Sequence, residues 1–100
     1  MNITKQNEDG HVTLSLQGRL DTLTAPELAD YIKANLDDCV DLTLNLADVD
    51  YVSSAGLRVV LMLQKRFPQA GAFQIVQVSP EVMEVFEMTG FADILSITAK

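Results

Sequence analysis

Cysteine and histidine are nearly absent from this chain, which contains one of each in 100 residues. The lone Cys39 cannot form an internal disulfide, and a single thiol does not build a metal cluster. We therefore expect no metal and no cofactor, and a free thiol is typical of a reducing compartment. A chain of this length can bury a hydrophobic core large enough to fold without such supports.

Long apolar segments are also absent. The first ten residues, Met1 to Gly10, contain no hydrophobic stretch of the kind found in secretory signals. Arg58 and the Lys65–Arg66 pair interrupt the most apolar candidate segment. No window therefore reaches the ~20 apolar residues that a membrane span requires. We expect a cytoplasmic protein without membrane contacts.

Basic residues are few, with 7 Lys and Arg against 14 Asp and Glu, and the formal net charge is −7. Proteins that bind nucleic acid neutralise phosphates with clustered Lys and Arg, whereas the basic residues here are scattered. This charge pattern argues against a nucleic-acid partner. The 48% hydrophobic content and the three prolines indicate one compact globular domain over residues 1–100.

The motifs of common enzyme classes are missing. Neither a Gly-x-x-x-x-Gly-Lys phosphate loop nor a Gly-x-Gly-x-x-Gly fingerprint occurs. Ser54-Ala55-Gly56 matches only half of the nucleophile elbow Gly-x-Ser-x-Gly, because Val52 occupies the position of the first glycine. The only histidine, His11, lies beside a predicted turn, with no nucleophile next to it in the sequence. We therefore expect no catalytic residues and no enzymatic activity.

Patterns of apolar residues divide the chain into eight elements. Asp9-Gly10 predicts a hairpin turn between the first two strands. Thr24 and Glu27 match a capping box with Pro26 in the first turn, which predicts the start of the first helix. The predicted strands cover 3–6, 12–17, 40–46, 73–78 and 94–97, and the predicted helices cover 24–36, 53–67 and 79–89.

After the opening hairpin, predicted strands alternate with predicted helices. That order favours parallel strand pairing through right-handed crossovers. We therefore predict an α/β fold with one mixed sheet of about five strands and three main helices.

Two adjacent serines, Ser53 and Ser54, stand where the third predicted strand leads into the second helix. A helix N-terminus has unpaired backbone N–H groups and the positive end of the helix dipole. A serine there can cap the helix or can carry a phosphate. Ala55 and Gly56 follow with little bulk, which leaves the backbone open to another protein. Position alone favours a plain cap for at least one of the two serines.

The second predicted helix is apolar on two stripes, which is more than contact with one sheet requires. Exposure of part of it, around Arg58 or Met62, would suit a protein interface. Packing of the second stripe against a neighbouring helix is an equally good interpretation.

Over essentially its whole length the chain resembles the STAS family, in particular the bacterial anti-sigma factor antagonists of the partner-switching type. Five segments carry the resemblance in order along the chain. They are Gly18-Arg19-Leu20-Asp21 with Thr24, Leu42 to Leu46, Tyr51-Val52-Ser53-Ser54-Ala55-Gly56-Leu57, Ser79-Pro80 and Phe86 to Gly90.

This resemblance implies a signalling function. The unmodified protein would bind an anti-sigma factor that is also a serine kinase, and binding would free the sigma factor. Phosphorylation of one serine would end the binding, and a PP2C-type phosphatase would reset it. The family's usual string is Asp-Ser-Ser/Thr-Gly-Leu, with the acceptor two positions before the glycine, which places it at Ser54. Ser53, which replaces the usual Asp, is the alternative acceptor, and Ala55 replaces the second hydroxyl residue.

The same resemblance implies a monomer and a set of partner contacts around this motif. Asp21 matches an acidic residue that the family places near the phosphorylation site, although it can also be a turn aspartate ahead of the first helix. The expected partner-binding residues are Asp21, Ser53, Ala55, Gly56 and Arg58.

Two other functions stay open. Some STAS proteins are non-phosphorylated subunits of transport or stress-signalling complexes, and in such a protein Ser54 would only cap the helix. A hydrolase with Ser54 as nucleophile is a third possibility, which would need a base within reach of the serine.

Overall fold

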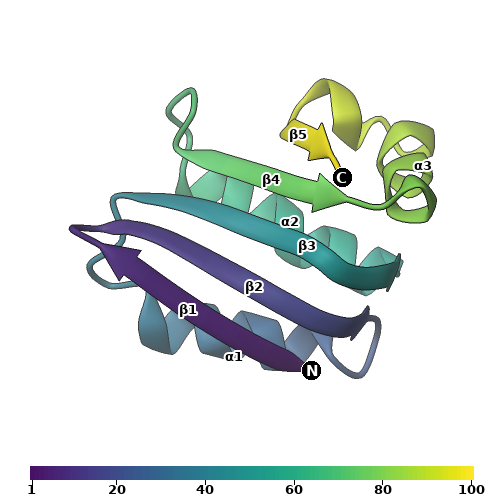
Figure 1. Cartoon of the computed structure of the whole chain (residues 1–100). Helices are drawn as coiled ribbons and strands as arrows, with labels where there is room; N and C mark the ends of the chain where they lie inside the picture. Colours follow the sequence, from purple (N-terminus) through teal and green to yellow (C-terminus); the bar gives the residue numbers. More distant parts are fainter.

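The computed structural model describes residues 1–100 as one sheet flanked by helices (Figure 1). The strands are β1 (Asn2–Glu8), β2 (His11–Leu20), β3 (Asp41–Val52), β4 (Phe73–Val78) and β5 (Ser96–Ala99). The helices are α1 (Ala25–Asn35), α2 (Ser54–Arg66), α3 (Pro80–Met88) and the short 3₁₀ helix η1 (Phe91–Asp93). None of these helices is long and apolar enough to cross a membrane.

The five strands lie in the order β1-β2-β3-β4-β5, and only the β1–β2 pair is antiparallel. In the turn between β1 and β2, Asp9 (φ 54°) and Gly10 (φ 90°) both take the left-handed conformation, as a type I′ hairpin requires. The Asn7 side chain supports this turn by accepting a hydrogen bond from the Gly10 N–H at 2.9 Å. The predicted α/β fold, with a mixed sheet, an N-terminal hairpin and three main helices, is confirmed.

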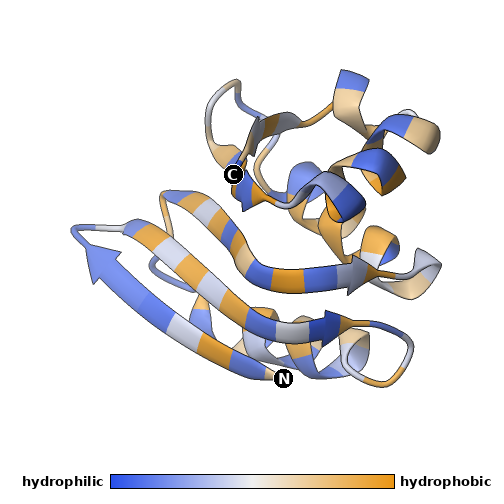
Figure 2. Ribbon diagram, turned by 45° about the vertical axis from the view of Figure 1, so that its right-hand side comes forward, coloured by the Kyte–Doolittle hydropathy of each residue, from blue (hydrophilic) through white to orange (hydrophobic).

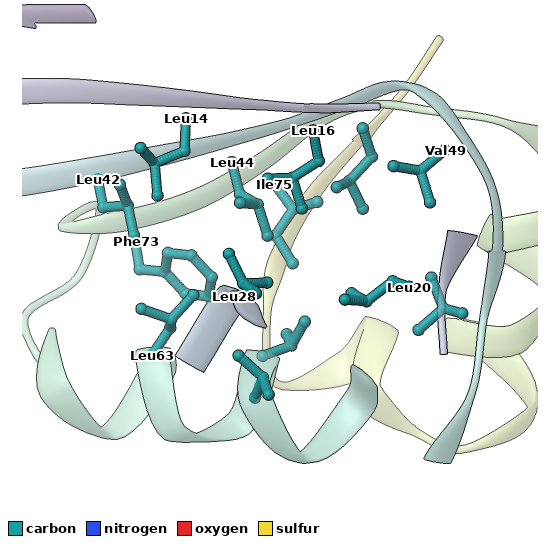
Figure 3. Close-up of a cluster of buried hydrophobic side chains, with 14 of the residues drawn as sticks. Leu14, Leu16, Leu20, Leu28, Leu42, Leu44, Val49, Leu63, Phe73 and Ile75 are labelled. Carbon is teal, nitrogen blue, oxygen red and sulfur yellow. The ribbon is translucent and has the colours of Figure 1, made fainter. Parts of the chain in front are cut away.

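The hydrophobic core lies on one face of the sheet. Figure 3 shows side chains of the central strands pointing toward Leu28 of α1 and Leu63 of α2. Val82 and Phe86 of α3 complete this core and are fully buried. The core residues of the three central strands, each at most 3% exposed, include Val12, Leu14, Leu16, Leu42, Leu44, Leu46, Phe73 and Ile75.

The opposite face of the sheet is polar, because successive strand residues point to opposite sides. Hydrophobic and hydrophilic residues accordingly alternate along β2 and β3 (Figure 2). Thr13 pairs in register with Thr43, and Ser15 with Asn45. The alternation predicted from the sequence for the second strand is therefore confirmed.

Only β4 matches its predicted bounds, and the other strand boundaries differ by one to three residues, except the end of β3, which differs by six. β3 continues to Val52 instead of ending at Leu46, and β5 begins at Ser96 instead of Ile94. The pairing of β2 with β3 shifts register twice near the end of β2, so the strict alternation of buried residues breaks beyond Leu46. Val49 and Val52 are still buried. This part of β3 stays paired with β2, although its buried residues no longer occur at every second position.

The predicted capping box at the start of α1 is wrong. The Thr24 hydroxyl does not cap α1 but accepts a hydrogen bond from the Asp21 N–H (2.8 Å) and donates one to the Arg19 carbonyl (2.5 Å). Glu27 does not reach back to Thr24 and instead contacts the N-terminal ammonium of Met1 at 3.3 Å. Hydrogen bonds within the β2–α1 loop therefore take the place of the predicted capping contacts.

Candidate functional site

The predicted serines lie at the C-terminal ends of strands β2 and β3, where α1 and α2 begin. This is one of the two short edges of the sheet, formed by strand ends. The two turns are tied together, because the Ser53 N–H donates a hydrogen bond to the Leu20 carbonyl at 2.8 Å. Residues from the β2–α1 loop and from the first turn of α2 therefore form one continuous surface. The structure thus brings Asp21 and the Ser53–Gly56 segment to the same edge.

Gly56 fixes how closely the first turn of α2 approaches β2. A Cβ atom at position 56 would lie 2.7 Å from the Leu20 Cγ atom and 2.9 Å from the Leu20 carbonyl oxygen. Both distances are shorter than any normal contact, so only glycine fits here. Gly56 is itself buried, and it therefore positions the surface and does not form part of it.

The two serines have different environments. Ser53 has an extended backbone, and its Oγ accepts a hydrogen bond from the Gly56 N–H at 3.3 Å, so Ser53 is the N-cap of α2. Ser54 is the first residue of α2, and its side chain is exposed. No hydrogen bond of the chain involves the Ser54 hydroxyl. The capping role falls to Ser53, and the Ser54 hydroxyl is free.

Asp21 is a turn residue whose carboxylate accepts hydrogen bonds from its own loop. Its Oδ1 accepts hydrogen bonds from the backbone N–H groups of Leu23 (3.0 Å) and Thr24 (3.1 Å). The pKa of Asp21 lies below its ordinary value, chiefly because of the Thr24 N–H, with smaller contributions from Leu23 and the charge of Arg19. The carboxylate is thus held in place within the β2–α1 loop.

Arg19 and Tyr51 extend this surface. The Arg19 guanidinium lies 4.2 Å from the centre of the Tyr51 ring and 3.6 Å from the Asp21 carboxylate. Leu23, which is 82% exposed, projects from the β2–α1 loop nearby in the chain. Sequence reasoning did not select Leu23 or Tyr51 as site residues. A leucine within an otherwise polar turn was the signal that could have identified Leu23.

A shallow groove of about 340 Å³ runs between the starts of α1 and α2. Small side chains create it, because Ala25 and Ala29 of α1 face Ala55 of α2 across it. Arg58 is the one charged residue of its lining, which comprises Thr22, Ala25, Pro26, Ala29, Ala55, Arg58 and Val59. Two of the predicted contact residues, Ala55 and Arg58, therefore border a hollow next to Ser54.

His11 lies at the other end of the strands. It begins β2, and its Nδ1 is 2.6 Å from the carboxylate of Asp41, the first residue of β3. Ser54 lies two residues beyond the end of β3, so the whole 12-residue length of that strand separates the two groups. His11 therefore lies too far from Ser54 to act as its base.

The fold and this edge define a small α/β module that presents a free serine hydroxyl at the start of a helix, with no histidine beside it. The chain belongs to the STAS domain family, since the family model for the STAS domain matches residues 2–100.

Relatives in sequence cover nearly the whole chain. BtrV of Bordetella bronchiseptica, assigned as an anti-sigma factor antagonist, is 36% identical over 99 residues, covering 97% of this chain and 85% of the relative. The anti-sigma-B factor antagonist of Bacillus subtilis is 33% identical over 100 residues, covering 96% of this chain and 88% of the relative.

Solved structures share the fold. An anti-sigma factor antagonist from Mycobacterium paratuberculosis superposes with a TM-score of 0.87 at 23% identity, covering 99% of this chain and 86% of the other. The antagonist SpoIIAA gives a TM-score of 0.79 in its unphosphorylated form and 0.72 in its phosphorylated form, both at 16% identity. The alignments cover 99% of this chain and 90% and 93% of those two chains.

Proposed function

We propose that this protein is an anti-sigma factor antagonist whose activity is controlled by phosphorylation of Ser54. The observation that carries the proposal is the exposed Ser54 hydroxyl, free of hydrogen bonds, on the first turn of α2. Two relatives named as anti-sigma factor antagonists support the proposal, since they are 36% and 33% identical and align over nearly the whole chain. The function is regulatory and not enzymatic, and it operates in the cytoplasm.

In this proposal the unphosphorylated surface binds an anti-sigma factor that is also a serine kinase. The contact is made by the edge that carries Asp21, Ser53, Ala55 and Arg58, with Gly56 holding that edge in shape. Exposed Leu23 and Tyr51 supply apolar area, which suits a protein partner. The kinase phosphorylates Ser54, the complex separates, and a PP2C-type phosphatase restores the binding form.

Phosphorylation would act here by charge and not by unfolding. A phosphate adds about −1.5 to −2 charges, which a helix N-terminus tolerates. Because Ser53 already caps α2, Ser54 can carry the phosphate without loss of the cap. A dianion in a closely packed interface is hard to desolvate. A loss of roughly 2–3 kcal/mol would weaken binding about 30-fold to 150-fold.

Two residues depart from the family's usual string, and the structure bears on both. Ser53 stands in place of Asp, yet its hydroxyl performs the capping contact that an aspartate could make. Ala55 stands in place of a second hydroxyl residue and lines the groove between α1 and α2. Neither change removes the free hydroxyl at position 54.

The test is an affinity pull-down from lysate of the native organism with four paired baits. Wild type and Ser54→Ala should both retain a kinase-like anti-sigma factor, and Ser54→Asp should lose it. Gln69→Glu is the matched control, because it adds one negative charge at an exposed position after α2 and should bind like wild type. Transfer of ³²P from ATP to wild type but not to Ser54→Ala would identify the acceptor.

Two outcomes would contradict the proposal. If all four baits retain the same transporter or stress-complex component, the protein is a non-phosphorylated STAS subunit and Ser54 has no switching role. If Ser54→Asp shows large shift changes throughout its NMR spectrum relative to wild type, the substitution refolds the protein and the surface mechanism is wrong.

A further inference from the structure

Arg58 is the free cation of the candidate site. Its side chain is exposed, and no carboxylate of the chain lies within ion-pairing distance of it. The other arginine at this edge, Arg19, is engaged by both Asp21 (3.6 Å) and the Tyr51 ring (4.2 Å). A guanidinium without a partner, in the lining of an apolar groove, is available to an anion that arrives at this surface.

Ser54 and Arg58 are four residues apart on the same helix. Residues at this spacing are neighbours on the helix surface, with ~5–6 Å between their Cβ atoms. The order is also favourable, because an anionic residue four positions before a cationic one pairs better than the reverse. Arginine binds phosphate through two parallel N–H···O bonds, a geometry that lysine does not offer.

No other charged group of this surface competes for Arg58. Asp21 accepts hydrogen bonds from its own loop, and Glu27 contacts the N-terminal ammonium at 3.3 Å. Asp50, near the end of β3, is exposed and forms no ion pair with Arg58. A phosphate on Ser54 is therefore the anion best placed to reach this arginine.

We propose that Arg58 is the phosphate-binding residue of the switch, and that phosphoserine 54 pairs with it along the surface of α2. The inference rests on the proposed function, since it concerns the phosphorylated form of the same site. It adds a second effect to phosphorylation. The modification introduces a negative charge and at the same time withdraws the free positive charge from the rim of the α1–α2 groove.

This pairing has a consequence for the partner. In the unphosphorylated protein Arg58 is free to contact an acidic group of the bound anti-sigma factor. In the phosphorylated protein the same guanidinium is held by the phosphate, so its positive charge is no longer available to the partner. Binding would also require desolvation of the phosphate–arginine pair, which costs free energy. A phosphatase has to separate the phosphate from Arg58 before the phosphoserine can enter its active site.

The test uses the full chain with phosphoserine placed at position 54 by genetic encoding, so it requires no kinase and no partner. The second ionisation of the phosphate, which has a pKa of about 6, is followed by ³¹P NMR between pH 4 and 9. Arg58→Gln, Arg58→Lys and the control Lys65→Gln are compared with the unsubstituted phosphoprotein. Lys65 lies on the same helix and is exposed, so its substitution changes the net charge equally but at the far end.

A nearby cation favours the dianion, so the phosphate pKa should be lower in the unsubstituted phosphoprotein than in Arg58→Gln. The expected difference is ~0.3–0.7 pH units, as for a solvent-exposed ion pair, with a smaller difference for Arg58→Lys and less than ~0.1 for Lys65→Gln. The helix N-terminus acts on all four proteins alike, so the differences isolate Arg58.

Equal phosphate pKa values in the unsubstituted phosphoprotein and Arg58→Gln would overturn the pairing, and so would equal effects of Arg58→Gln and Lys65→Gln. These results are separate from the proposed function. The pull-down can fail while the phosphate still pairs with Arg58, and the pairing can be absent in a protein whose phosphorylation still ends binding.

Discussion

Gly56→Ala is the substitution that most directly examines how the start of α2 is held. In an exposed helix the change would be favourable, because alanine is a better helix former than glycine by about 1 kcal/mol. Here the added methyl group would lie 2.7 Å from the Leu20 Cγ atom and 2.9 Å from the Leu20 carbonyl oxygen. The carbonyl belongs to the backbone and accepts the Ser53 N–H, so it cannot rotate away.

The two contributions have opposite signs. Forcing a methyl group into a packed site costs about 1–3 kcal/mol, and the upper part of that range applies where a backbone atom must move. Subtracting the gain in helix propensity leaves a net destabilisation of about 1–2 kcal/mol. For a domain of this size that corresponds to a fall in Tm of roughly 4–16 °C.

Urea unfolding followed by circular dichroism measures this difference, and Ala34→Gly serves as the calibration. Ala34 is exposed on α1, so its replacement should cost the propensity term of about 1 kcal/mol alone. We also expect weaker partner binding by Gly56→Ala, because displacement of α2 moves Ser54. A Gly56→Ala protein as stable as wild type, or more stable, would refute the argument that close approach to Leu20 requires glycine.

Three further outcomes follow from the same structure. Ser53→Ala should lower the unfolding free energy by about 1 kcal/mol through loss of the cap, whereas Ser54→Ala should change it by less than about 0.5 kcal/mol. Equal effects of the two substitutions in urea unfolding would contradict the assignment of the cap to Ser53. Because the pKa of Asp21 is depressed below its ordinary value of 3.8, its carboxylate stabilises the fold above that pH, and the contribution is lost as the pH falls through the folded-state pKa. The stability difference between wild type and Asp21→Asn should therefore shrink below pH 3.8 in a urea series, and a difference independent of pH would contradict this. Burial, together with the nearby charge of Asp41, raises the pKa of the Cys39 thiol. Iodoacetamide should therefore alkylate Cys39 more slowly at pH 8 in the folded protein than in the urea-unfolded protein. Equal alkylation rates would contradict the buried environment of this thiol.

The order and type of the elements could be predicted because local patterns determine them. Alternating apolar residues identify β2, and Asp9-Gly10 identifies the hairpin. The end of β3 could not be predicted, because its last residues are kept in the sheet by a shifted pairing with β2 that no local pattern records. The start of α1 was predicted correctly, with Thr24 at the N-cap position, but the capping contact was wrong, because the Thr24 hydroxyl bonds to Asp21 and Arg19 in the folded loop.

Only part of the candidate site could be predicted from the sequence. Ser53 and Ser54 both belong to a residue type that caps helices, and only the backbone geometry assigns the cap to Ser53. The role of Gly56 depends on Leu20, which is distant in the chain and is brought against it by the β2–β3 pairing. The groove beside Arg58 arises from alanines on two helices, and alanine carries no functional signal by itself.

The order of the strands in the sheet has a consequence for synthesis of the chain. Because the spatial order β1-β2-β3-β4-β5 is also the order in sequence, each new strand emerges from the ribosome next to an edge that already exists. Each crossover also delivers its helix before the next parallel strand arrives, so α1 precedes β3 and α2 precedes β4. A nascent chain can therefore fold by addition at one edge, with no strand left to insert between two others. All residues of the candidate site lie between 19 and 59, so this surface is built from elements that precede β4 in the chain.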